Sequence, residues 1–127
     1  DAFDGGPVGV ESVAAALKTA RWMAGERQLI AVLGQMAELG PIAAEEHERV
    51  GELAARLHVD RLITVGPEAE AIAVAGVREG VEPDQVASYD DAAQVLDDVR
   101  AHARPGDLVL FKGSRVAGLE KLAEALR

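Results

Sequence analysis

The chain has 127 residues, enough for one domain, and no cysteine, which removes disulfides, thiolate metal sites and cysteine nucleophiles. Its 13 basic and 22 acidic residues give a formal net charge of −9, which disfavours nucleic acid and anionic membrane surfaces as partners. No apolar run reaches the length of a membrane span and nothing resembles a signal peptide, so we expect a cytoplasmic protein.

Apolar residues recur at helical spacing in several parts of the chain. The clearest stripes consist of Val10, Val13, Ala14 and Leu17, and of Val50, Leu53, Ala54 and Leu57. Shorter or less regular patterns predict further helices over residues 69–77, 92–99 and 116–126. Ser88, followed three residues later by Asp91, predicts a capping box at the start of the fourth helix.

Short continuous apolar runs separate these helices. Residues 29–33, 62–65 and 108–111 predict strands that are buried on both faces of a parallel sheet, and residues 86–88 predict a weaker strand. An opening strand is expected to end at or before residues 1–3. The alternation predicts an α/β fold, a three-layer sandwich with a mostly parallel sheet and helices on both faces.

Three of the predicted strands end in a glycine turn that leads towards a helix. The turns contain Gly34, Gly66 and Gly113, and Pro67 is expected in the first turn of a helix. The carboxyl ends of parallel strands meet at one edge of a sheet, and ligands bind at that edge in open α/β folds. Any functional site is therefore expected there, together with residues 1–7.

The segment from Lys112 to Arg115 is the strongest candidate for chemistry. It places two cations, the hydroxyl of Ser114 and a glycine turn at the start of a predicted helix, where free N–H groups favour an anion. The functional hypothesis is a carboxylate or phosphate site, and the alternative is a solvated helix start with Arg115 paired to a local acid. The spacing is not that of a phosphate-binding loop, so unaided ATP hydrolysis is not expected.

The segment 34–41 is long for a connection between a strand and a helix. Its length at the ligand edge indicates function, with Gln35 and Glu38 as the polar candidates. The alternative is an ordinary surface turn in which Met36 and Leu39 are apolar plugs.

Structural roles are predicted for several other polar and aromatic residues. His47 and His58 are expected on one helix, about 16 Å apart and too distant for a shared metal ion, so no metal site is predicted. His47 is expected on the helix surface, with a position at the ligand edge as the alternative. Asp97 and Asp98 are expected on a solvated face, and Trp22 is expected to fill a gap in the core.

Several segments resemble the C-terminal domain of the Mur ligases. The resemblance rests on VLGQMAELG, HERVG, LITVG, PGDLVLFKGSR and a Leu-Glu pair, at residues 32–40, 47–51, 62–66, 105–115 and 119–120. Their order and spacing hold over essentially the whole chain. The first and fourth motifs are most similar to the branch that adds D-Ala-D-Ala to UDP-N-acetylmuramoyl-tripeptide.

The resemblance implies that residues 1–127 form a single Rossmann-like domain, the C-terminal domain of a three-domain amide ligase of peptidoglycan precursor synthesis. N-terminal and central domains of the same polypeptide would hold the UDP-sugar, most of the ATP and the Mg²⁺. This domain would close over them and present the acceptor D-Ala-D-Ala. The chain alone would then hold no cofactor, contain no catalytic residue and be inactive.

The resemblance also implies two groups of binding residues. The substrate group is Lys112, Ser114, Arg115, Gln35, Glu38 and His47, and the nucleotide group is Asp1, Phe3, Asp4 and Pro7. Lys112 and Arg115 would offset the dipeptide carboxylate or polarise the reacting group. Residues 1–9 depart from the family pattern, since Phe3 and Asp4 stand where Tyr and Asn are usual.

Two alternatives remain open from the sequence. The chain could be an autonomous module that binds a small anion at the Lys112 turn, with no catalytic partner. It could instead be the same domain of another amide ligase of this superfamily, such as a folate polyglutamylating enzyme. The residues that follow the Lys-Gly pair favour the branch that adds D-Ala-D-Ala.

Overall fold

The described part of the protein contains one parallel sheet. The computed structural model describes residues 2–3, 10–36, 40–113, 116 and 119. Its strands are β1 (Ala2–Phe3), β2 (Leu29–Gly34), β3 (Arg61–Val65), β4 (Val86–Tyr89) and β5 (Leu108–Lys112), in the spatial order β1-β5-β2-β3-β4. All four neighbouring pairs are parallel. The strands predicted from the apolar runs and the expected opening strand are confirmed.

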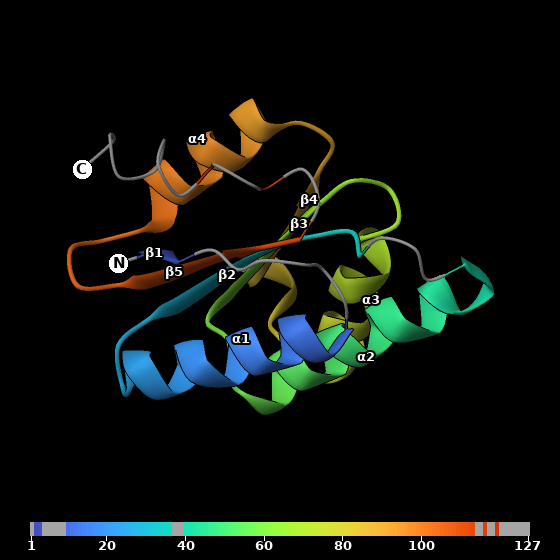
Figure 1. The fold of residues 1–127 in the computed structure, drawn as a ribbon. Helices are drawn as coiled ribbons and strands as arrows, with labels where there is room; N and C mark the ends of the chain where they lie inside the picture. The colour runs from blue at the N-terminus through green and yellow to red at the C-terminus, as the bar shows by residue number, and fades with distance from the viewer. Residues whose placement is uncertain (1, 4–9, 37–39, 114–115, 117–118, 120–127) are drawn as a thin grey trace.

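Helices cover both faces of the sheet. The structure places α1 (Val10–Ala24), α2 (Ala43–Arg56) and α3 (Glu70–Arg78) on one face and α4 (Ala92–His102) on the other, which confirms the three-layer α/β sandwich (Figure 1). Short 3₁₀ turns, Gly40–Ile42 and Pro83–Gln85, precede α2 and β4. The helix predicted over residues 116–126 lies almost wholly outside the described residues. In the described part, no helix combines the length and apolarity that a membrane crossing requires.

Two hydrophobic cores hold these layers together. Leu17 of α1 and Val50 of α2 pack with Leu33 and Leu110 on one face, whereas Val95 of α4 belongs to the core on the other face. Every residue of β2, β3 and β5 is buried. These strands therefore need apolar side chains on both faces, which explains their continuous runs.

The predicted capping box at Ser88 is wrong. Strand β4 continues to Tyr89, so Ser88 lies in the sheet, and its hydroxyl is 2.7 Å from Thr64 Oγ1. The N-cap of α4 is Asp91, whose Oδ1 accepts a 2.9 Å hydrogen bond from the Gln94 N–H. Asp91, which the capping box would put three residues into the helix, is thus the N-cap itself.

Two further local predictions are also wrong. Pro67 lies in the turn before α3, which begins only at Glu70, and not in the helix itself. Trp22 is 82% exposed instead of filling the core. It is two residues from both Ala20 and Ala24, which are buried, and two residues at about 100° each carry it to the opposite side of α1.

Close backbone packing fixes α2 against α3. A Cβ atom added at Gly51 would lie 2.3 Å from the Ile72 carbonyl oxygen and 3.0 Å from the Gly76 nitrogen. No side chain fits in that space, so the backbones of the two helices lie directly on each other. This contact sets the position of α2, which begins at the carboxyl edge of the sheet.

A buried ion pair joins α4 to β3, and it shows that the predicted solvated position of Asp98 is wrong. Arg61 Nε and Nη2 donate to the two Asp98 carboxylate oxygens at 2.6 and 2.7 Å. The side chains are only 7% and 2% exposed. Tyr89 Oη also donates to Asp98, and His102 Nδ1 lies 3.1 Å from Asp98 Oδ1. Asp97 is exposed, as predicted.

The ion pair controls the charge state of Asp98. Burial alone would raise the pKa of Asp98, but the hydrogen bonds from Arg61 and Tyr89 and the charge of Arg61 outweigh it and lower the pKa. The hydrogen bond that Tyr89 donates to Asp98 raises the pKa of Tyr89. Asp98 is therefore ionised and Tyr89 neutral over the physiological range.

We predict that Asp98→Ala lowers the free energy of unfolding by about 3–5 kcal/mol at neutral pH, because it leaves the Arg61 guanidinium buried without a carboxylate. Chemical denaturation measures the loss. Asp97→Ala is the matched control, since Asp97 is the exposed neighbour on the same helix. Equal losses in the two variants would contradict the assignment.

The same loss is expected to shrink in acid. The pKa of Asp98 is lower in the folded state than in the unfolded state, so the pair contributes fully above the unfolded-state value of about 4. This contribution disappears as the pH falls through the folded-state pKa. A difference between wild type and Asp98→Ala that does not change with pH would show that the charge is not its cause.

Candidate functional site

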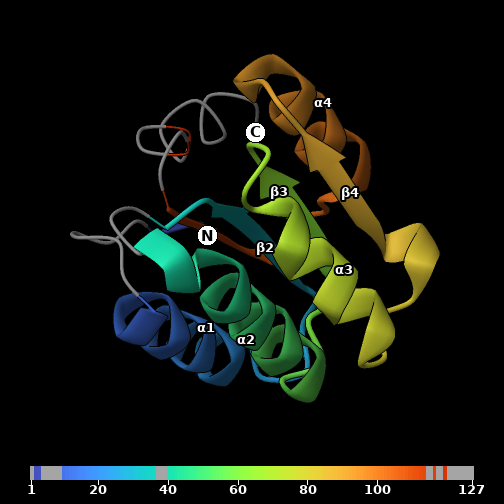
Figure 2. The same cartoon turned by 90° about the vertical axis from the view of Figure 1, so that its right-hand side faces the viewer.

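The carboxyl ends of the central strands meet at one edge of the sheet. Leu33 pairs with Lys112 and Gly34 pairs with Val65, so β2, β3 and β5 end side by side. Figure 2 looks onto this edge, at which α1 and α2 also begin. The prediction that the three glycine turns share an edge is confirmed.

Two of the glycine turns touch through their backbones. A Cβ atom at Gly113 would lie 2.6 Å from the Gly34 carbonyl oxygen and 2.7 Å from the Gly34 nitrogen, and Gly113 has φ = 114°. Only glycine combines this backbone conformation with so close an approach. The contact brings the segment after β2 against the segment after β5.

Lys112 is buried at this edge, with 3% of its surface exposed. Strand alternation places its side chain on the same face as Leu108 and Leu110, towards the layer of α1 and α2. No described residue forms a hydrogen bond or an ion pair with its ammonium group. The alternative of a solvated helix start is therefore wrong for Lys112, and a buried cation without a carboxylate is well suited to hold an anionic ligand.

The remaining sequence candidates are distributed unevenly. Gln35 is half-buried directly after β2, and Phe3 lies in β1 opposite Leu110. The structure thus brings Gln35 to the same edge as Lys112. The candidates outside the described residues are Asp1, Asp4, Pro7, Glu38, Ser114 and Arg115.

His47 is fully buried, so its predicted surface position is wrong. Its Nδ1 lies 2.6 Å from the Ala43 carbonyl oxygen, and its Nε2 accepts a 2.9 Å hydrogen bond from the Met36 N–H. A signal for this burial was present in the sequence, because His47 lies three residues before Val50 on the apolar stripe of α2. The polarity of histidine, which favours the surface, led to the wrong prediction.

Other expectations about histidine and methionine have mixed outcomes. His58 does not share a helix with His47, because α2 ends at Arg56 and His58 has φ = 54° beyond it. Met36 is 2% exposed and is the apolar plug considered for the loop. Among the described residues, no three His, Asp or Glu side chains converge as metal ligands.

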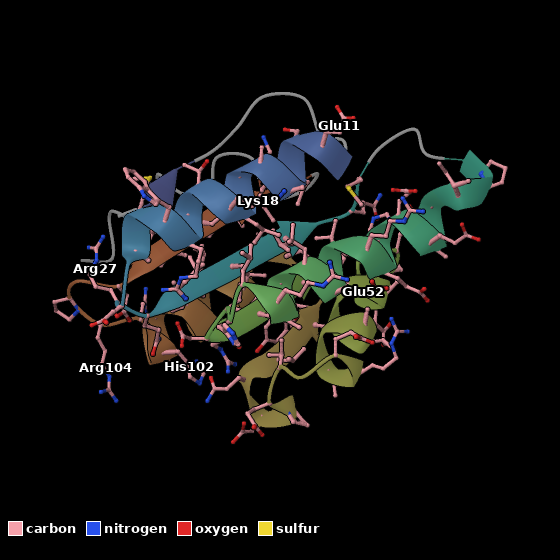
Figure 3. All side chains as sticks on the ribbon, turned by 90° about the horizontal axis from the view of Figure 1, so that it is seen from below. Glu11, Lys18, Arg27, Glu52, His102 and Arg104 are labelled. Carbon is pink, nitrogen blue, oxygen red and sulfur yellow. The ribbon has the colours of Figure 1, made fainter. Side chains whose placement is uncertain are left out.

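A cavity of about 380 Å³ lies away from this edge. Its lining includes Gln28, His58 and Asp60, which precede or flank the amino ends of β2 and β3. In Figure 3, the labels Arg27 and His102 mark this end of the molecule, and Glu11 marks the opposite end, where α1 begins. The cavity contains none of the predicted site residues.

Residues 9–115 match the family model described as "Mur ligase, glutamate ligase domain". The chain belongs to the Mur ligase family. It is 40% identical, over an alignment 145 positions long with gaps, to the UDP-N-acetylmuramoyl-tripeptide–D-alanyl-D-alanine ligase of Mycobacterium bovis, and the alignment covers 99% of this chain and 28% of the relative. The resemblance found in the sequence is confirmed.

Solved structures of Mur ligases have the same fold. The MurF ligase of Thermotoga maritima in complex with ADP matches with a TM-score of 0.71 and 26% identity, over 94% of this chain and 26% of that one. A domain from a putative ligase of Haemophilus ducreyi matches with a TM-score of 0.65 and 19% identity, over 99% of this chain and 90% of that domain. The chain therefore spans about a quarter of the whole ligases and nearly all of the single domain.

Proposed function

We propose that this Mur ligase domain is the C-terminal domain of a three-domain enzyme that adds D-Ala-D-Ala to UDP-N-acetylmuramoyl-tripeptide. Relatives named UDP-N-acetylmuramoyl-tripeptide–D-alanyl-D-alanine ligase support the proposal, and the chain covers only 28% of the Mycobacterium bovis protein. The N-terminal and central domains would bind the UDP-sugar, the ATP phosphates and Mg²⁺. This domain would close over them with its carboxyl edge, and by itself it would be inactive.

The proposed reaction forms an amide in two steps. The γ-phosphoryl group of ATP passes to the tripeptide carboxylate, which gives an acyl phosphate and ADP. The amine of D-Ala-D-Ala then attacks the acyl carbon, loses a proton and displaces inorganic phosphate. Negative charge is present on the acceptor carboxylate and on every phosphate, so a fixed cation at the closing edge stabilises the assembled reactants.

The burial of Lys112 without a partner among the described residues is the observation that carries this proposal. Its ammonium would offset the dipeptide carboxylate or polarise the reacting group, together with Arg115 and the hydroxyl of Ser114. Gln35 and Glu38 would line the acceptor pocket. The start of α1 at the same edge adds the positive end of a helix dipole.

The nucleotide-binding role proposed for the opening segment is a separate part of the model. Asp1, Phe3, Asp4 and Pro7 would contact the adenine end of ATP. In the described part, Phe3 of β1 pairs with Leu110 of β5, the strand that ends in Lys112. This neighbourhood supports one shared closing edge for nucleotide and acceptor.

We predict that Lys112→Met in the full-length ligase lowers turnover by about 10²-fold or more, the effect of removing one charge-stabilising donor. The melting temperature should not fall, since methionine fills the same buried space without an unpaired charge. Phosphate release and thermal melting measure the two quantities.

Lys18→Met is the matched control, because Lys18 is exposed on α1 and is labelled in Figure 3. It should leave both turnover and melting temperature unchanged. Parallel losses of turnover and stability in Lys112→Met, or no loss of turnover, would return Lys112 to a structural role.

A second prediction concerns the domain organisation. The sequence encoded before Asp1 should contain a Gly-Lys-Thr or Gly-Lys-Ser loop and the rest of a ligase, since the central domain would need that loop to hold the ATP phosphates. Sequencing the gene upstream of this segment decides the matter. A gene that encodes no such loop would favour the autonomous anion-binding module.

A further inference from the structure

We infer that His47 is a positioning residue that fixes the acceptor edge by holding the backbone of Met36, and with it Gln35, beside the turn at Gly113. The inference rests on the proposed function, because it concerns the pocket in which the acceptor would bind. It assigns no direct contact with substrate to His47. The two ring nitrogens already contact backbone atoms of Met36 and Ala43.

The two hydrogen bonds define one chemical state of the imidazole. The Ala43 carbonyl oxygen can only accept, so Nδ1 carries the proton that it shares at 2.6 Å. The Met36 N–H can only donate, so Nε2 is the bare nitrogen that accepts at 2.9 Å. His47 is therefore neutral and protonated on Nδ1. In this state it joins the first turn of α2 to the segment that follows β2.

The segment after β2 is held at several points around Gln35. On one side, Gly34 is paired with Val65 in the sheet and pressed against Gly113. On the other side, Met36 has its side chain in the core and its N–H on His47. Gln35 is the half-buried residue between these fixed points, so the backbone on both sides of it restricts its position.

The location of these anchors connects them with Lys112. Leu33 is the register partner of Lys112, and Gln35 follows Leu33 by two residues on the neighbouring strand. A shift of the Met36 backbone would therefore move Gln35 relative to the buried ammonium group. An error of about 1 Å in such positioning is enough to cost a reaction about 10²-fold.

Helix α2 has its own support, so His47 is not needed to hold it. Gly51 lies against the backbone of α3, and Val50 and Ala54 are buried in the core. Loss of the imidazole leaves these contacts in place and removes two hydrogen bonds, those to the Met36 N–H and to the Ala43 carbonyl oxygen in the first turn of α2. The effect should accordingly be local to the acceptor edge.

The test compares His47→Leu with His47→Gln in the full-length ligase. Leucine fills the core but cannot accept from Met36, whereas the glutamine amide oxygen can take the place of Nε2. We predict that His47→Leu raises the KM for D-Ala-D-Ala about ten-fold, because binding must then order the freed segment, at a cost of the size of one buried hydrogen bond. The KM for ATP should change less than about two-fold, and His47→Gln should restore most of the acceptor affinity.

Other kinetic outcomes would overturn the inference. These are an unchanged KM for D-Ala-D-Ala in His47→Leu, a failure of His47→Gln to rescue it, or equal losses for all substrates that follow a lowered melting temperature.

A spectroscopic measurement separates this inference from the proposed function and does not depend on a folded leucine variant. In wild type, ¹⁵N NMR should show His47 protonated on Nδ1 and bare on Nε2, with a slowly exchanging Met36 amide. His47→Gln should keep that slow exchange. The opposite tautomer or a fast-exchanging Met36 amide would overturn the positioning role. A wild-type ligase that does not use D-Ala-D-Ala would instead overturn the proposed function.

Discussion

Strands β2, β3 and β5 are buried on both faces of the sheet, and this burial determines where polar side chains can lie. These strands carry apolar side chains over almost their whole length, so polar groups gather where the strands begin and end. At the amino edge the charges are satisfied: Asp60 accepts from the Leu29 N–H at 2.8 Å, and Arg27 donates to the Gly106 carbonyl at 3.0 Å. At the carboxyl edge, Lys112 has no such partner among the described residues.

The two buried cations Arg61 and Lys112 differ in whether a described residue supplies their counter-ion. Arg61 has both of its carboxylate contacts inside the fold, which attaches α4 to the sheet. Lys112 is equally buried, yet the described part of the domain supplies no anion for it. Removing one partner of a buried ion pair is strongly destabilising, so the Arg61–Asp98 pair supports the fold, whereas we propose that a ligand supplies the anion for Lys112. This difference is the reason to place the function at Lys112 and not at Arg61.

Much of the fold could be predicted because its signals are local. Continuous apolar runs identified β2, β3 and β5, and the glycine turns identified the edge that they share. The ion pair of Asp98 could not be found in this way, because its partner Arg61 lies 37 positions away along the chain. His47 is a different case: its place on the apolar stripe of α2 indicates burial, whereas its polarity favours the surface. Its contact with Met36 depends on how the loop returns to the helix, which no local pattern specifies.

We propose that the carboxyl edge of the sheet binds an anion through Lys112. The most direct measurement is an NMR titration of the ¹⁵N-labelled chain with inorganic phosphate, D-Ala-D-Ala and ATP, repeated on Lys112→Met. Inorganic phosphate and D-Ala-D-Ala should shift the amides of Gly34, Gln35 and Gly113, and these shifts should disappear in the variant, whereas ATP should also shift amides of residues 1–7. Shifts centred on the cavity at the other end of the strands, shifts at Gly34, Gln35 and Gly113 that persist in Lys112→Met, or no shift with any of the three ligands would contradict anion binding at Lys112.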